Sequence, residues 1–344
     1  MNHRLLSPLA VFAALTMIAA PVRTPAPTTL PALTAEAWIA VDAASGVAVV
    51  EFNADEQRAM ASVTKLMTAL VARDHSGLDE RVRVSDAAAD VGEAEIGLVA
   101  GEVWSVRDLL AAVMVRSAND AAYALAEYVG GDIEGFAVLM NEKAAELGLQ
   151  HSHFTNPHGL DEDGHYTSAR DLATIGEAVL DDDVLSQLAQ TGIIRFKPAP
   201  DGTSRIAVNT NHLLNTYPGV VGLKTGYTTE AGRVLVTAFE VEDQTFVVVV
   251  MGSEDHFADS AAILDYLTQR LTVTDRFLLP LVEFEGGGGG AVGLLDPVTE
   301  AFVKTRNTES DGQESVTPWG GTPGSQQVLD MVRGMIPIVF GGTR

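Results

Sequence analysis

The strongest strand patterns in this sequence lie far apart, on either side of a long helical block. Residues 37–52 form two short apolar runs around a small-residue turn at 43–46, as in a β-hairpin. Residues 234–239 and 245–251 are β-branched and almost wholly apolar, which is typical of strands covered on both faces. The early hairpin and the late strands must therefore pair across the block between them. This order predicts a mixed α/β chain of the α+β type, with an antiparallel sheet and helices on its faces.

The block itself shows mainly helical periodicity, and capping signals mark where helices begin. One such signal is Ser105, three residues before Asp108. Helices are expected at 62–77, 105–114, 120–128, 133–147, 168–180 and 259–271. Short strands are expected at 81–84, 193–196 and 205–208, and loops at 91–101 and 151–167.

The composition limits what the chain can bind. Its formal net charge is −24, and five of its 22 basic residues are lysines, so it lacks the basic surface of a nucleic-acid-binding protein. A hydrophobic content of 47% is enough for a sizeable core. Because the sequence has no cysteine, disulfides, thiolate metal sites and a cysteine nucleophile are excluded together.

The N-terminus has the pattern of an export signal. Arg4 precedes an apolar run of 16 residues, Leu5 to Ala20, whereas a spanning helix needs about 20. Residues 1–20 are therefore predicted to be a signal peptide or an N-terminal anchor that associates with a membrane surface. Residues 21–35 read as a Pro/Thr-rich linker. The protein is expected to be exported, either to the cell envelope or into the medium.

Residues 276–344 are expected to form a Gly-rich linker and a C-terminal tail of unknown role. The glycine run at 286–290 lacks the Lys-Ser/Thr that follows in a phosphate-binding loop. The apolar stretch 328–340 is interrupted by charged residues, a glycine and a proline, and is too short to span a bilayer. It is compatible with a surface-lying segment or with an element docked on the main domain.

A hydroxyl and an amine stand three residues apart at Ser62 and Lys65, where a helical pattern begins. Residues at i and i+3 share one helix face, so the Lys65 amine can reach the Ser62 oxygen. A lysine whose pKa is lowered by burial or by a second cation can act as the base that activates a serine. The competing interpretation is a serine helix cap followed by a solvated lysine.

Two further short motifs are compatible with the same chemistry. Ser117 and Asn119 lie between two helical patterns, where they can face one cavity or simply cap a helix. Lys224, Thr225 and Gly226 precede the late strand pair. On an extended edge, Gly226 would let a peptide backbone approach, while Lys224 would attract a carboxylate and lower the pKa of Lys65.

Together, S-x-x-K, S-x-N and K-T-G stand in the order found in penicillin-binding proteins and serine β-lactamases, at separations of 55 and 107 residues. The chain resembles the low-molecular-mass penicillin-binding proteins, specifically the D-alanyl-D-alanine carboxypeptidases of serine peptidase family S11. This resemblance extends over about 37–271. It implies a transpeptidase-like catalytic domain at 36–275, with a five-stranded antiparallel sheet flanked by helices and a helical subdomain. The segments that carry it are 61–68, 117–122, 156–160, 165–166, 169–173 and 222–228.

The resemblance also implies roles for individual residues. Ser62 would attack the substrate and Lys65 would take its proton. Ser117 would relay a proton to the leaving group, and Asn119 would hold the substrate amide and Lys65. The substrate-binding residues would be Lys224, Thr225, Gly226, Tyr227, Thr228 and His256, with the Ser62 and Tyr227 N–H groups forming an oxyanion hole. His256 stands where family members usually have an arginine.

The resemblance implies that no cofactor is needed, that peptidoglycan stem peptides are substrates and that β-lactam antibiotics inhibit covalently. The histidines at 151, 153, 158 and 165 admit a zinc interpretation, but no H-E-x-x-H helix is present. We expect no metal, and we expect these histidines to tie down a loop beneath the site.

Three other functions remain open at this point. A D,D-endopeptidase would use the same machinery. A serine β-lactamase would need a glutamate base with an asparagine four residues later, and Glu162 has no such partner. A non-catalytic peptidoglycan-binding or penicillin-sensing module would not require the complete nucleophilic set.

Overall fold

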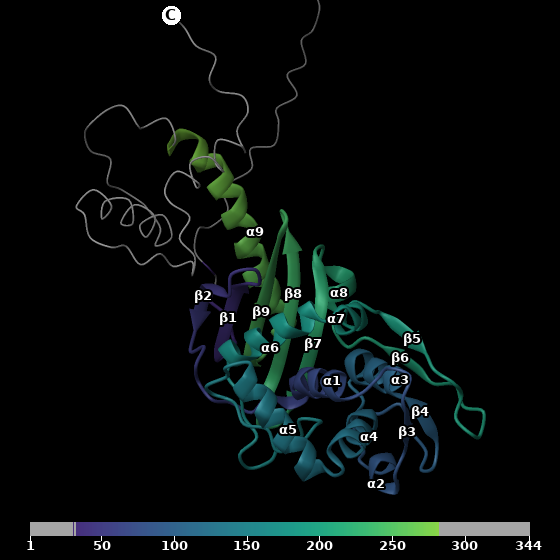
Figure 1. Cartoon of the computed structure of the whole chain (residues 1–344). Coiled ribbons are helices and arrows are strands. Elements are labelled where there is room, and N and C mark those ends of the chain that lie inside the picture. Colours follow the sequence, from purple (N-terminus) through teal and green to yellow (C-terminus); the bar gives the residue numbers. More distant parts are fainter. Residues whose placement is uncertain (1–29, 31, 282–344) are drawn as a thin grey trace, which may run out of the picture. The chain divides into compact units, whose positions relative to one another are not determined.

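A five-stranded antiparallel sheet organises the structure, a computed structural model that describes residues 30 and 32–281 (Figure 1). The strand order is β2-β1-β9-β8-β7, as the predicted fold requires. The strands are β1 (Ala37–Asp42), β2 (Val47–Phe52), β7 (Val220–Thr228), β8 (Gly232–Val241) and β9 (Gln244–Ser253).

The N-terminal hairpin pairs with the late strands across the helical block, which confirms the prediction. Ala37 of β1 lies opposite Met251 of β9, and Asp42 lies opposite Phe246. Strand β7 is at one edge of the sheet, beside β8.

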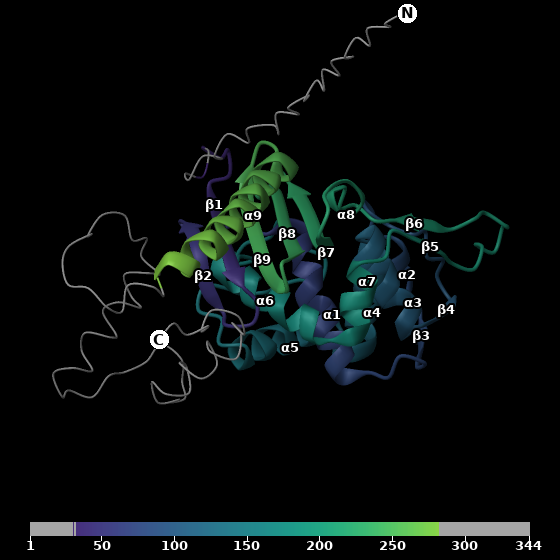
Figure 2. The ribbon, with the colours of Figure 1, turned by 90° about the horizontal axis from the view of Figure 1, so that it is seen from above.

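Both faces of the sheet are covered, which explains why its central strands are almost wholly apolar. Val247 and Val249 of β9 pack in the core shared with α1 (Thr64–His75) and α6 (Ala169–Asp181). Val248 and Val250 pack in a second core, on the opposite face, with α9 (His256–Leu281). Figure 2 shows the sheet between α9 on one side and α1 and α6 on the other. Successive side chains of β9 thus pack alternately into two different hydrophobic cores.

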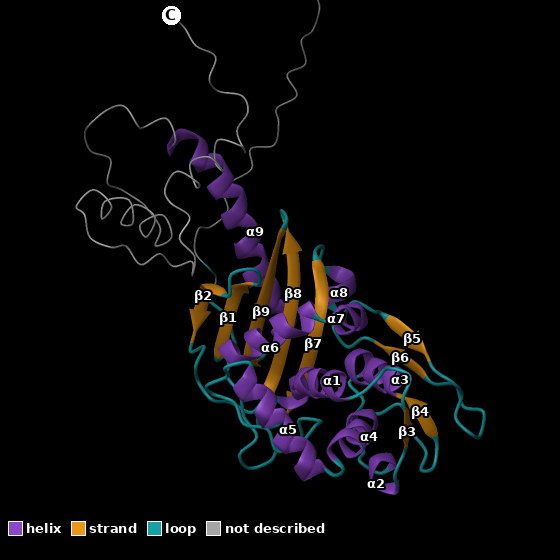
Figure 3. Ribbon diagram, viewed as in Figure 1, coloured by secondary structure: helices purple, strands orange, loops and turns teal. Residues whose placement is uncertain are grey.

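The helical block forms a subdomain beside the sheet (Figure 3). The predicted helices are present as α1, α3 (Val106–Ala111), α4 (Asn119–Gly130), α5 (Ile133–Glu146), α6 and α9. The predicted short strands are β3 (Arg81–Arg83), β5 (Ile193–Arg195) and β6 (Ile206–Val208).

Several short elements were not predicted, because three to seven residues carry too little periodicity to read. These are α2 (Asp86–Ala89), β4 (Val103–Ser105), α7 (Asp183–Ala189) and α8 (Leu213–Thr216). Two turns matter for the site: the 3₁₀ turn η1 (Ala61–Val63) and the π turn η2 (Ala112–Arg116).

The predictions for the two ends fall mostly outside the described residues. The structure does not describe the signal peptide or anchor at 1–20, residues 21–29 and 31 of the linker, or residues 282–344 of the predicted tail. At the end of the linker, Thr34 donates through its N–H and its hydroxyl to the Asp259 carboxylate of α9, at 3.0 and 2.6 Å. By residue contacts the chain divides into two units, 1–278 and 279–344. Within the described part, no helix is long and apolar enough to cross a membrane.

Candidate active site

The predicted contact between Ser62 and Lys65 is present. Ser62 lies in η1 rather than in the helix proper, and Lys65 is the second residue of α1. Ala61, which begins η1, has a left-handed φ of +50°. This turn brings the Ser62 hydroxyl to 2.9 Å from Lys65 Nζ, in the geometry of a nucleophile beside its base.

Lys65 is fully buried, and its surroundings favour the neutral amine. Burial places its pKa well below the ordinary 10.5, and the charge of Lys224 lowers it further, while Glu93 and Asp120 act in the opposite direction. Lys65 Nζ also donates to the His158 carbonyl, at 2.6 Å. A neutral amine held by two partners is suited to accept a proton from a hydroxyl.

The loop that supplies the His158 carbonyl is packed directly beneath the nucleophile. Gly159 has φ +85°, and a Cβ there would collide with the Ala61 carbonyl and would lie 2.7 Å from Thr64 Oγ1. The Thr68 hydroxyl donates to the Pro157 carbonyl, at 2.6 Å. Only glycine fits at this contact, so residues 156–160 fix both the η1 turn and the lysine.

Two of the loop histidines lie in this region and are neutral. His165 lies 2.9 Å from Thr64 Oγ1 through Nε2 and accepts from the Thr155 N–H at 3.1 Å through Nδ1. Burial lowers the pKa of His165 to about 4 and that of His158 to about 3. The expectation that histidines tie down the loop is confirmed for His165. No group of three or more His, Asp or Glu side chains in the described ranges is arranged to hold a metal ion.

The side chains of Ser117 and Asn119 do not cap the helix that follows them. Ser117 ends η2 with φ +65°, and the cap of α4 is Ala118, which has no side-chain cap bond. Asn119 is buried, and its Nδ2 donates to the Gly92 carbonyl at 3.1 Å. Its Oδ1 has no hydrogen-bond partner among the described residues. Leaving a buried amide oxygen without a hydrogen-bond donor costs free energy. This oxygen is therefore suited to accept an N–H from a bound ligand.

Strand β7 brings the third motif against the nucleophile. A Cβ at Gly226 would lie 2.9 Å from the Ser62 backbone nitrogen and 3.0 Å from Ala61 Cβ, so the strand and the η1 turn are in close contact. Lys224 is buried and donates to the Thr225 carbonyl at 2.8 Å. Burial lowers the pKa of Lys224 to about 7. The first and third motifs thus meet at one edge of the sheet.

The other predicted substrate-binding residues surround this edge with different degrees of exposure. The Thr225 hydroxyl lies 2.6 Å from the Thr210 hydroxyl, and the Thr228 hydroxyl accepts from the Ala231 N–H at 3.1 Å. Tyr227 is 67% exposed.

His256 begins α9, and burial together with the nearby charge of Arg233 lowers its pKa to about 4. In the described part of the chain, no hydrogen bond joins His256 to Lys224 or Thr225. At neutral pH it therefore brings no positive charge to this edge.

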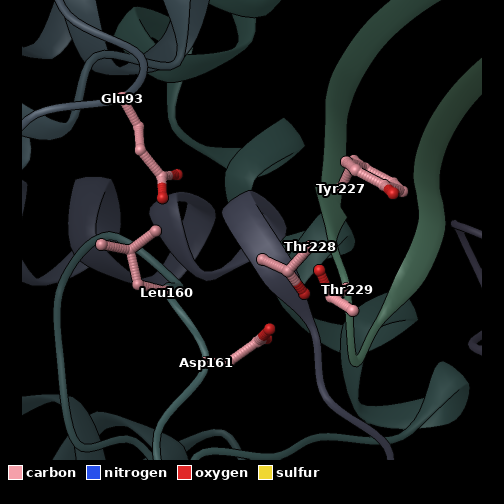
Figure 4. Close-up of a pocket in the computed structure, with 6 residues that line it drawn as sticks. All are labelled: Glu93, Leu160, Asp161, Tyr227, Thr228 and Thr229. Carbon is pink, nitrogen blue, oxygen red and sulfur yellow. The ribbon is translucent and has the colours of Figure 1, made fainter.

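An open groove of about 390 Å³ continues from this edge (Figure 4). Two carboxylates, Glu93 and Asp161, face it from the loops that were predicted at 91–101 and 151–167. The sequence marked these segments only as loops, so neither acidic residue was predicted. The groove is lined by Glu93, Leu160, Asp161, Tyr227, Thr228 and Thr229.

The sequence matches known proteins across this whole region. Residues 23–255 match the peptidase S11 family, described as D-alanyl-D-alanine carboxypeptidase. The chain is 34% identical to D-alanyl-D-alanine carboxypeptidase DacF of Bacillus subtilis over 240 residues, 67% of this chain and 61% of that protein. It is 33% identical to DacB2 of Mycobacterium tuberculosis over 241 residues, 67% of this chain and 81% of that protein. The chain thus spans about three fifths of the length of the B. subtilis relative.

Solved structures show the same fold. The Streptomyces K15 DD-transpeptidase superposes with a TM-score of 0.65 at 30% identity, covering 69% of this chain and 98% of that one. The D-alanyl-D-alanine carboxypeptidase DacD of Francisella tularensis gives a TM-score of 0.66 at 29% identity, covering 72% of this chain and 73% of that one.

Proposed function

Because this chain belongs to the D-alanyl-D-alanine carboxypeptidase family of serine peptidases, S11, we propose that it removes the terminal D-alanine from peptidoglycan stem pentapeptides. The observation that carries the proposal is the 2.9 Å contact between the Ser62 hydroxyl and the buried Lys65 amine. A serine beside a neutral lysine is a nucleophile with its base, and mere binding requires neither.

In the first half of the reaction, Lys65 takes the Ser62 proton as Oγ attacks the carbonyl carbon of the penultimate D-alanine. The N–H groups of Ser62 and Tyr227 hold the oxyanion, each contributing roughly 3 kcal/mol to the transition state. Ser117 gives its proton to the nitrogen of the departing D-alanine and receives the Ser62 proton from Lys65, which leaves the amine neutral for the second half. Water then attacks the ester carbon, which releases the shortened peptide and returns the proton to Ser62.

The substrate would lie along the free edge of β7 as an added antiparallel strand. This direction places its terminal carboxylate beside Lys224 and Thr225. Its preceding residues then run past Thr228 into the groove. The unpartnered Asn119 oxygen would accept an N–H of the peptide. Gly226, with no side chain, leaves the scissile bond room to reach Ser62.

The same nucleophile would open β-lactam rings, and the resulting ester would make the inhibition covalent. Family members act on peptidoglycan, which is located in the cell envelope. We propose that this protein is exported there, and that residues 1–20 either are removed or keep it at the membrane surface.

A serine β-lactamase needs a base that deacylates quickly. Glu162, the acidic residue considered for that part, is engaged elsewhere. Its carboxylate accepts from Asn156 Nδ2 and from the Thr155 hydroxyl, each at 2.9 Å, and these bonds lower its pKa. A D,D-endopeptidase shares every group of the site, and only a crosslinked substrate distinguishes it from a carboxypeptidase.

The test is release of D-alanine from a peptide ending in D-Ala-D-Ala, with fluorescent penicillin labelling in parallel. Wild-type protein should release D-alanine and label with one penicillin per chain, and Ser62→Ala should do neither. Ser204→Ala, in the exposed loop between β5 and β6, is the matched control and should behave as wild type. Labelling without release would replace the carboxypeptidase with an endopeptidase or a transpeptidase, for which crosslinked peptides and an amine acceptor are the next substrates. The absence of both signals would refute the proposal.

A further inference from the structure

A carboxylate bound at this edge of the sheet requires a positive charge, and the two buried lysines supply it poorly. Lys65 is the neutral base. Because the pKa of Lys224 is lowered to about 7, a fraction of the molecules carries no charge on Lys224 at neutral pH. His256 is neutral as well. Another cation, Arg233, lies near enough to His256 for its charge to lower the pKa of that imidazole.

Arg233 lies on β8 directly opposite Tyr227 of β7. Its guanidinium carbon is 5.7 Å from the centre of the Tyr227 ring, and Nη1 donates to the Glu254 carbonyl at 2.9 Å. The ring and the carbonyl thus hold the guanidinium at the surface of the strand pair. Its other N–H groups have no hydrogen-bond partner in the described part of the chain, and the side chain is exposed.

The strand register places this guanidinium on the same side of the sheet as Thr225. Thr225 lies opposite Leu235, and Tyr227 lies opposite Arg233. Because side chains alternate along a strand, these four residues share one face, and Leu235 packs with α9 on that face. Thr225 and Arg233 are therefore diagonal neighbours across two strands, a separation of roughly 7–8 Å between Cα atoms that an arginine spans easily.

In Figure 4 the Tyr227 ring points away from Glu93 and Leu160. Tyr227 thus borders both the acidic groove and the Arg233 guanidinium. A peptide with a free carboxyl terminus fits this polarity when its carboxylate is directed toward the arginine.

We propose that Arg233 binds the terminal carboxylate of the substrate together with the Thr225 hydroxyl, and so selects peptides and β-lactams that carry a free carboxylate. The inference rests on the proposed function. A guanidinium offers two parallel N–H donors to a carboxylate, a geometry that a lysine ammonium does not match. Arg233 would accordingly contribute to substrate binding rather than to proton transfer.

The test compares Arg233→Gln with wild type on two peptides that differ only at the C-terminus, one ending in D-Ala-D-Ala acid and the other in its amide. For the acid, kcat/KM should fall about 10- to 100-fold, mainly through KM, which is the range for losing a charged hydrogen-bonded pair. For the amide it should change by less than about threefold, since an amide makes no ion pair. Arg195→Gln, an exposed arginine on β5, is the matched control and should leave both unchanged.

A second pair of probes makes this test independent of peptide hydrolysis. Acylation of Ser62 by benzylpenicillin should slow in Arg233→Gln, whereas acylation by its methyl ester should not. If wild type releases no D-alanine, the proposed function fails and the penicillin pair still decides on Arg233. Acid and amide slowed equally, or neither slowed, would overturn the inference. Thermal unfolding and methyl-ester acylation together show that the variant is folded.

Discussion

Gly226 offers the sharpest test of the site, because a single added methyl group should disable the oxyanion hole. A Cβ at this position would lie 2.9 Å from the Ser62 nitrogen, 3.0 Å from Ala61 Cβ and 3.2 Å from the Val63 nitrogen. Ordinary contacts are longer, so Gly226→Ala must push the η1 turn from the strand by several tenths of an ångström. The φ of Gly226 lies outside the left-handed region, so alanine itself adds no backbone strain.

The expected loss follows from the group that is displaced. The Ser62 N–H is one of the two proposed oxyanion donors, and losing one such donor costs about 2.7–4 kcal/mol, or 10²- to 10³-fold in rate. Overpacking at the same contact should lower the stability by about 1–3 kcal/mol. We therefore expect a much larger effect on catalysis than on folding.

The assay is the second-order rate constant for acylation by fluorescent penicillin, measured beside the melting temperature. Gly192→Ala is the matched control, because its Cβ would meet nothing nearer than Asn215 Oδ1, at 4.0 Å. An acylation rate within about threefold of wild type, far short of the loss of an oxyanion donor, would refute the placement of the oxyanion hole between β7 and η1.

Three further predictions concern buried charges. In Lys224→Met, the pKa of Lys65 should rise because a positive neighbour is removed, so the rising limb of the pH–acylation profile should move to higher pH; an unmoved limb would contradict this coupling. Asp120 accepts N–H bonds from loop 91–101, and Asp120→Asn should cost about 1–3 kcal/mol in urea unfolding, with loss of under 0.5 kcal/mol arguing against that anchoring. Burial raises the pKa of Glu177 to about 7, above its unfolded value, so its ionisation destabilises the fold as pH rises from about 4.5 to 7. Glu177→Gln should therefore raise the melting temperature by a few degrees at pH 8 and little at pH 4.5, and an equal change at both would count against this explanation.

The sheet could be predicted because the hydrophobic pattern of its strands shows that both of their faces are buried. Residues 234–239 and 245–251 are almost wholly apolar because each stretch faces two cores. Strand β7 was harder to predict, because it contains the poor strand formers Gly222, Lys224 and Gly226. Its extended form is set by pairing with β8, which a local pattern does not show.

The side chains of the site were predictable from motif chemistry, whereas its backbone partners were not. The His158 carbonyl that holds Lys65 belongs to a residue whose side chain suggested a different role. The position of Arg233 depends on the register of two strands, which the sequence does not specify. His256 is neutral because it is buried in the folded chain. Its position in the site could therefore be predicted from the sequence, but its charge state could not.

The pairing of β1 with β9 also governs how this protein can acquire its structure. Ala37 and Met251 are adjacent in the sheet although more than 200 residues separate them in the chain. Contacts this distant in sequence close a long loop and make folding slow. A growing chain cannot complete the sheet until β9 has been synthesised. Until then, the β1 edge of the N-terminal hairpin has no strand to pair with. We expect a late, cooperative collapse, and a chain truncated before Gln244 should never reach the native state.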